Sequence, residues 1–253
     1  MLFLPDDDGI SPNYVAALAA QLEKHPSAVL GFGRQEFVDE AGHVLGKSVD
    51  ALPDYLSGPD FIRATWRQYA FRFQSVTPFL GKTSELRGCG GWVEFTRGTH
   101  MDDALVVKMC LRGGVVFSSD CVYRNLVDGA SSGWSVSARE LAAAVREFHY
   151  FLERDPVTQN YARAHPSDWS DLRNCLVEMS WGAYLWRWRD IYRQRLSYPK
   201  WVMAAFALPL IPAFYRRALP ILLKSLRRPA QPKEPSVATA AGQVHPKTTP
   251  PRP

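Results

Sequence analysis

The 253-residue sequence predicts a mixed α/β fold to about residue 125, followed by helices and a disordered tail. In the first half, short apolar runs bounded by glycine and proline alternate with helical patterns, as in an α/β fold. From Ser137 onward only helical periodicity remains, and the last 25 residues contain seven prolines. Hydrophobic residues make up 46% of the chain, which is enough for a buried core and excludes a wholly disordered protein.

The elements of the first half follow from apolar spacing and from turn residues. Helices are predicted over 13–24, 59–73 and 103–111, because their apolar side chains recur on one face. Strands are predicted over 28–33, 77–82 and 115–118, with a hairpin formed by 36–39 and 43–45. The sequence Gly88-Cys-Gly-Gly91 predicts a loop, since glycine runs break both helices and strands.

Helical signals dominate the second half. Ser137 and Glu140 have the spacing of a capping box, which predicts a helix from Ser137 to about Arg154. A longer helix is expected over 168–195. The predicted organisation is therefore a partial α/β domain, a helical extension, an apolar and basic segment, and a proline-rich disordered tail. These four parts cover 1–130, 131–198, 199–228 and 229–253.

The formal net charge of +5 hides an uneven distribution. Residues 1–180 carry a net charge of −6, whereas 181–228 carry +9. The apolar runs of 200–228, interrupted and followed by Lys and Arg, suit an anionic membrane surface, although they could also cover the domain. Aromatic and Arg residues alternate over 181–195, but an amphipathic helix explains them better than nucleic-acid binding, so nucleic acid is not expected as a partner.

The sequence indicates a cytoplasmic protein at the inner face of the membrane. The N-terminus lacks the basic region of a signal peptide, and no stretch of 18 uninterrupted apolar residues suggests a spanning helix. The four cysteines form no CxxC pair, and Cys110 and Cys121 lie in apolar surroundings. Buried free thiols of this kind are typical of a reducing compartment.

Two groups of carboxylates bear directly on chemistry. Asp6, Asp7 and Asp8 follow an apolar, strand-like run, where a bound Mg²⁺ or Mn²⁺ would relieve the repulsion between like charges. A solvated acidic turn is the alternative interpretation. Asp102 and Asp103 precede an apolar helix, where they could cap its N-terminus or provide a general base.

The order of these motifs resembles that of the family 2 glycosyltransferases with the GT-A fold. The resemblance starts with the aspartates and Pro12, then continues through His25-Pro26 and Val38-Asp-Glu-Ala-Gly42. It next covers 77–92, with its strand and glycine loop, and ends in the acidic pair. It spans roughly residues 1–125.

The resemblance implies a role for each acidic residue. Asp6 and Asp8 would bind Mg²⁺ or Mn²⁺. Asp7 would contact the ribose or sugar of a nucleotide-sugar donor, which Gly90 and Gly91 would also bind. Asp103 would deprotonate the acceptor hydroxyl for in-line attack with inversion. Asp102 would replace the usual Glu of the family's catalytic pair and hold the loop.

Two departures from the family pattern are evident. The aspartate motif normally follows a nucleotide-binding half, so the chain is expected to be a fragment, to start at the wrong methionine or to be a degenerate relative. The family's additional metal-binding His is missing after the strand that follows the acidic pair, where Asp128 could substitute. His100 is interpreted as a loop or helix-start residue rather than a ligand.

The sequence thus predicts metal-dependent, inverting transfer of a sugar to a glycan or lipid-linked acceptor, in a chain whose activity is doubtful without the missing half. The alternative is a non-catalytic remnant that binds membranes or proteins. A metal-dependent phosphoester hydrolase using the same aspartates is the third hypothesis.

Overall fold

The computed structural model describes residues 1–48, 53–67, 78–127 and 136–195, with side chains only to residue 184 in the last helix. The predicted segments 199–228 and 229–253, and Asp128, lie outside these residues. The strands are β1 (Leu2–Phe3), β2 (Gly9–Ile10), β3 (Ala28–Val38), β4 (Val44–Lys47), β5 (Tyr55–Leu56), β6 (Phe79–Gly81) and β7 (Gly114–Leu126). The helices are α1 (Tyr14–Lys24), α2 (Gly58–Ile62), α3 (Thr83–Gly88), α4 (Met101–Cys110), α5 (Ala138–Arg154), α6 (Pro156–Ala164) and α7 (Pro166–Arg195).

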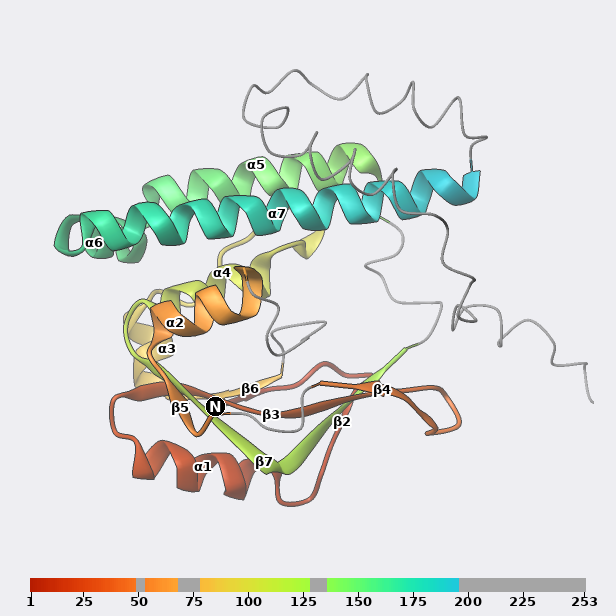
Figure 1. The fold of residues 1–253 in the computed structure, drawn as a ribbon, viewed down its shortest axis with the longest axis vertical. Coiled ribbons are helices and arrows are strands. Elements are labelled where there is room, and N and C mark those ends of the chain that lie inside the picture. Colours follow the sequence, from red (N-terminus) through yellow and green to blue (C-terminus); the bar gives the residue numbers. More distant parts are fainter. Residues whose placement is uncertain (49–52, 68–77, 128–135, 196–253) are drawn as a thin grey trace, which may run out of the picture.

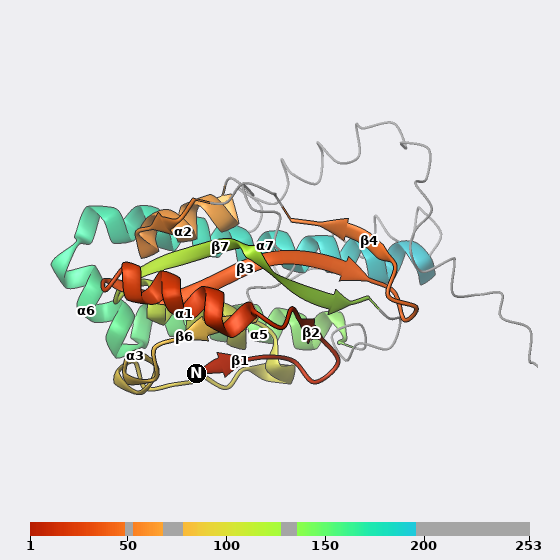
Figure 2. The same ribbon diagram turned by 90° about the horizontal axis from the view of Figure 1, so that it is seen from below.

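The molecule is a layered α/β structure, which confirms the predicted mixed fold. The central sheet has the order β1-β6-β3-β7-β2, with β4 on β3 and β5 on β7. Helix α1 covers one face of the sheet, and α2 and α4 cover the other (Figure 1). Seen from below, α1 lies across β3 and β7 (Figure 2). Helices α5 and α7 form a further layer above α2 and α4 (Figure 1).

Two long strands form the axis of the sheet. β3 and β7 pair in parallel from Ala28 to Val38, with an irregularity beyond Gly33 where β7 bends. The strand predicted over 115–118 therefore continues to Leu126, and the one predicted over 28–33 continues into the β3–β4 hairpin. The prediction was too short because exposed Ser119 and Asp120 at the bend interrupt the apolar pattern.

The helical predictions hold in outline. The capping box of Ser137 and Glu140 is present, and α5 ends at Arg154 as expected. The helix predicted over 59–73 is α2 continued by a π-helical turn, Arg63–Arg67, and its remaining residues lie outside the described part of the chain. Helices α3 and α6 were not predicted, because a single turn or two of helix gives little periodicity. Among the described helices, none is both long and apolar enough to cross a membrane.

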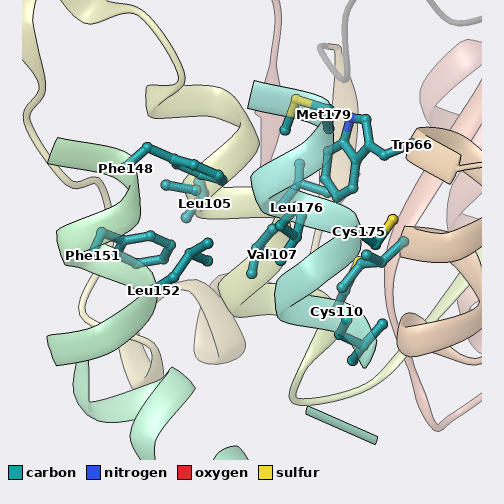
Figure 3. Packing of buried hydrophobic residues seen from close by; sticks show 14 of the residues in the cluster. Trp66, Leu105, Val107, Cys110, Phe148, Phe151, Leu152, Cys175, Leu176 and Met179 are labelled. Carbon is teal, nitrogen blue, oxygen red and sulfur yellow. The ribbon is translucent and has the colours of Figure 1, made fainter. Parts of the chain in front are cut away.

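The hydrophobic core has one part on each face of the sheet. On the α1 side, Tyr14 and Leu18 pack against Val116 and Tyr123. The larger part lies between the sheet and α2, α4, α5 and α7. Figure 3 shows part of it, where Leu105 and Val107 of α4 meet apolar side chains of α5 and α7; these are Phe148, Phe151, Leu152, Cys175, Leu176 and Met179. The helical layer therefore shares its core with the sheet domain. All four cysteines are buried and unpaired, in accord with the prediction for Cys110 and Cys121.

Candidate functional site

The aspartate motif lies at the carboxyl edge of the sheet. Strand β6 separates β1 from β3 and is antiparallel to both, so β1 points in the same direction as β3 and β7. The chain leaves β1 into Asp6, Asp7 and Asp8, and Asp8 reaches the last residues of β7. Open α/β sheets bind their ligands at this edge.

Asp8 is held by the end of β7. Its Oδ1 accepts hydrogen bonds from the backbone N–H of Leu126 at 2.8 Å and from Nδ2 of Asn125 at 3.2 Å. Its Oδ2 accepts a further bond from the hydroxyl of Tyr123. Burial, together with the bond to this carboxylate, raises the pKa of the Tyr123 phenol well above its ordinary value. Asp8 thus fixes β2 and the preceding turn against β7.

These contacts fit poorly with the metal site expected from the resemblance. Three donors already occupy the carboxylate of Asp8, whereas Asp6 and Asp7 are exposed. Within the described residues, no three acidic, histidine or cysteine side chains are grouped so that they could hold a metal ion. Binding of Mg²⁺ or Mn²⁺ by Asp6 and Asp8 stays a prediction that the present arrangement of side chains does not support.

The glycine loop lies against both β1 and α4. Gly90 and Gly91 adopt positive φ angles of 78° and 65°, which glycine accepts without strain. The carbonyl oxygen of Gly91 accepts a hydrogen bond of 2.9 Å from Nζ of the buried Lys108 on α4. The ring of Trp92 packs on Phe3 of β1, with 4.7 Å between centroids. The loop predicted to bind a donor therefore adjoins the strand that leads to the aspartates.

The acidic pair begins α4 and includes a histidine. His100 is the N-cap residue, with the left-handed φ of 67°, and its ring lies inside the protein. Its Nδ1 is 2.7 Å from Oδ2 of Asp103. The backbone N–H of Asp103 donates to Oδ1 of Asp102 at 2.9 Å. Burial first, and then the charge of Asp103, raise the pKa of Asp102 to about 6.

Helix α5 holds the loop that carries His100. The carboxylate of Glu147 accepts hydrogen bonds from the backbone N–H and the hydroxyl of Thr96, at 2.6 and 2.7 Å. Phe148 packs against His100 on one side and Phe95 on the other, at centroid distances of 5.2 and 6.1 Å. The helical extension therefore positions the acidic pair.

The structure does not bring the two acidic motifs into contact. Asp8 bonds to β7, whereas Asp103 bonds to His100. Helix α4 ends just before β7 begins, so the C-terminal end of α4 lies near the amino end of β7. The N-terminal end of α4, which carries the acidic pair, lies toward the carboxyl side of the sheet. A shallow apolar hollow of about 350 Å³ lies between α1 and β6, and none of the acidic residues of the motifs lines it.

Sequence reasoning missed three partners of these acids. Tyr123 and Asn125 alternate along β7, and this spacing places both side chains on the face that receives Asp8. His100 was recognised as a helix-start residue, which the structure confirms, but not as the partner of Asp103. The sequence did offer a signal for the contact between His100 and Asp103, because side chains three residues apart at a helix start are neighbours.

No model of a known protein family matches the sequence, and no curated protein matches it.

Proposed function

We propose that this chain belongs to an enzyme that transfers a sugar from a nucleotide-sugar to an acceptor hydroxyl with inversion, and that Asp103 is the general base. The hydrogen-bonded acidic pair at the start of α4 is the observation that carries the proposal. Supporting it are the aspartate motif at the carboxyl edge of the sheet and the glycine loop between β1 and α4. The order of motifs shared with family 2 glycosyltransferases supplies the reaction class.

The proposed reaction requires one ionised carboxylate next to the acceptor. Oδ2 of Asp103 bonds to His100, and Oδ1 has no hydrogen-bond partner among the described residues. Oδ1 would take the proton of the acceptor hydroxyl as its oxygen forms a bond to the anomeric carbon. The bond from that carbon to the diphosphate oxygen breaks, and the diphosphate leaves with the electron pair. Attack opposite the leaving group inverts the configuration.

Asp102 would support Asp103 rather than share the base role. Two adjacent carboxylates at one helix start cannot both ionise at low cost, and the pKa of Asp102 is the one raised, to about 6. Burial and the neighbouring carboxylate thus disfavour the charged form of Asp102. We therefore assign Asp103 the base role and Asp102 a supporting role, as the resemblance implies.

The partners follow from the reaction and from the segment beyond the described residues. The donor is a nucleotide-sugar, contacted by Asp7, Gly90 and Gly91, and the acceptor is a glycan or a lipid-linked sugar. The apolar and basic residues of 200–228 would hold the enzyme at the inner, anionic face of the membrane. Mg²⁺ or Mn²⁺ remains the expected cofactor. This expectation needs a test, because the carboxylate of Asp8 already accepts hydrogen bonds from three donors of β7.

A non-catalytic remnant is the second candidate, and the bonds of Asp8 favour it. Three donors from β7 give the carboxylate of Asp8 a role in the fold that needs no metal. This hypothesis predicts binding to anionic vesicles through 200–228 but no turnover of any donor.

The test is a donor screen with the full chain. UDP-, GDP- and dTDP-sugars are incubated with MnCl₂ or with EDTA, and release of the nucleoside diphosphate is measured. Release from one donor, lost in Asp103→Asn but kept in the exposed Asp120→Asn, supports sugar transfer. Absence of release from every donor, with vesicle binding intact, supports the remnant. Release of phosphate from p-nitrophenyl phosphate instead would indicate a phosphoester hydrolase.

A further inference from the structure

His100 is placed to act on Asp103, and no motif of the sequence assigns it a role. Its side chain is only 5% exposed and that of Asp103 is 18% exposed, so the contact between them is shielded from water. Charged hydrogen bonds of this kind are stronger than neutral ones. The 2.7 Å distance from Nδ1 to Oδ2 therefore restricts how the carboxylate can turn.

The backbone around His100 is also unusual. His100 and Arg97 are the non-glycine residues of the described chain with positive φ, at 67° and 59°, and both belong to the loop that enters α4. Such conformations cost free energy and persist where the surroundings enforce them. Here Glu147 and Phe148 of α5 enforce them, through Thr96 and the imidazole ring.

The second nitrogen of His100 is buried and has no partner in the part of the chain that the structure describes. Within the described residues, Nε2 makes no hydrogen bond. Imidazole needs a hydrogen on only one nitrogen when it is neutral, so an Nε2 that lacks an acceptor favours the tautomer with the hydrogen on Nδ1. That hydrogen points at Asp103. Asp102 from α4 and His149 from α5 are the other titratable groups that act on this cluster.

We propose that His100 is a positioning residue, which donates its Nδ1 hydrogen to Oδ2 of Asp103 and so aims Oδ1 at the acceptor hydroxyl. The hydrogen bond from His100 to Asp103 does not depend on the proposed function, but the aiming of Oδ1 at an acceptor hydroxyl rests on it. Orientation matters because small displacements of a catalytic group can cost about a hundredfold in rate. Helix α5 then contributes to the reaction indirectly, by holding the ring of His100.

Two substitutions separate the side chain from the backbone. Asn and Gly both tolerate positive φ, so His100→Asn and His100→Gly keep the loop. The Asn amide nitrogen takes nearly the place of Nδ1 and still donates to Asp103, whereas Gly has no donor. Thermal unfolding of both variants confirms that each is folded before it is assayed.

The first measurement does not depend on activity. In the full chain labelled with ¹⁵N-histidine at pH 8, the resonances lost in His100→Asn identify His100, and we expect them to show hydrogen on Nδ1 and none on Nε2. A hydrogen on Nε2 instead would overturn the proposal, because Nδ1 could then only accept.

The second measurement uses the donor found in the screen. We expect kcat to fall about tenfold or more in His100→Gly, with KM for the donor nearly unchanged, and to recover largely in His100→Asn. Equal loss in both variants would contradict positioning by a hydrogen bond. If wild type turns over no donor, the proposed function fails, while the ¹⁵N spectrum still decides whether His100 holds Asp103.

Discussion

Asp7 and Asp8 are neighbours in the sequence, yet of the two only Asp8 has side-chain hydrogen bonds to other described residues. Three donors from the end of β7 converge on its carboxylate, and Asp7 is exposed. The sequence predicted the acidic motif and its place after a strand. It could not predict this division of roles, since the partners lie more than a hundred residues away.

This difference predicts opposite outcomes for two alanine variants. Asp8→Ala leaves the Tyr123 hydroxyl and the Leu126 N–H without their acceptor, so the free energy of unfolding should fall by about 1–2 kcal/mol. Asp7→Ala should change it by no more than about 0.5 kcal/mol. Urea unfolding measures both. Equal effects of the two substitutions would show that β7 does not hold Asp8.

Asp102 predicts a dependence of stability on pH. Its pKa is near 3.8 in the unfolded chain and about 6 in the folded protein, so the folded state is penalised as the pH rises between these values. Asp102→Asn keeps an oxygen that can accept from Asp103 but removes the charge. We expect it to be more stable than wild type at pH 7, by up to about 3 kcal/mol, and within about 0.5 kcal/mol of it near pH 4.

Urea unfolding of Asp102→Asn at both pH values checks this expectation. The matched control is Asp120→Asn on the bend of β7, whose exposed side chain should give no pH-dependent difference from wild type. A variant less stable than wild type at pH 7 would mean that the charged form of Asp102 stabilises the fold.

At the scale of elements, the contact between α2 and α4 could not be predicted from periodicity. The start of α2 approaches the end of α4 so closely that a Cβ at Gly58 would lie 1.8 Å from the carbonyl oxygen of Cys110. Sequence patterns identified α4, α5 and α7; α5 has one buried face, whereas in α4 all residues from Ala104 to Cys110 are buried. Periodicity failed at the π-helical turn after α2 and at the bend of β7, where contacts with other elements override local pattern.

Gly58→Ala tests that contact, and Gly182→Ala serves as the comparison. Gly58→Ala should lose about 2–3 kcal/mol of stability, because backbone atoms of α4 and the following turn must move. Gly182→Ala, in the interior of α7 with open space around its Cα, should gain about 0.5–1 kcal/mol from higher helix propensity. Thermal unfolding compares the two. A stable Gly58→Ala variant would indicate that α2 can move away from α4 without cost.

At the scale of the molecule, the helical extension is part of the candidate site. Leu105 and Val107 of α4 share their core with α5 and α7, and Glu147 and Phe148 hold the loop before α4. The sequence predicted the helices and the acidic pair separately. Their relation depends on packing between the two halves of the chain, which local patterns do not encode.

The base role of Asp103 is the central claim, and turnover by Asp103→Asn tests it most directly. With the donor identified in the screen, kcat should fall by at least about a hundredfold, while the Kd of the donor stays within about threefold of wild type. Asp120→Asn should keep the wild-type rate. An Asp103→Asn variant that transfers sugar as fast as wild type would contradict the account.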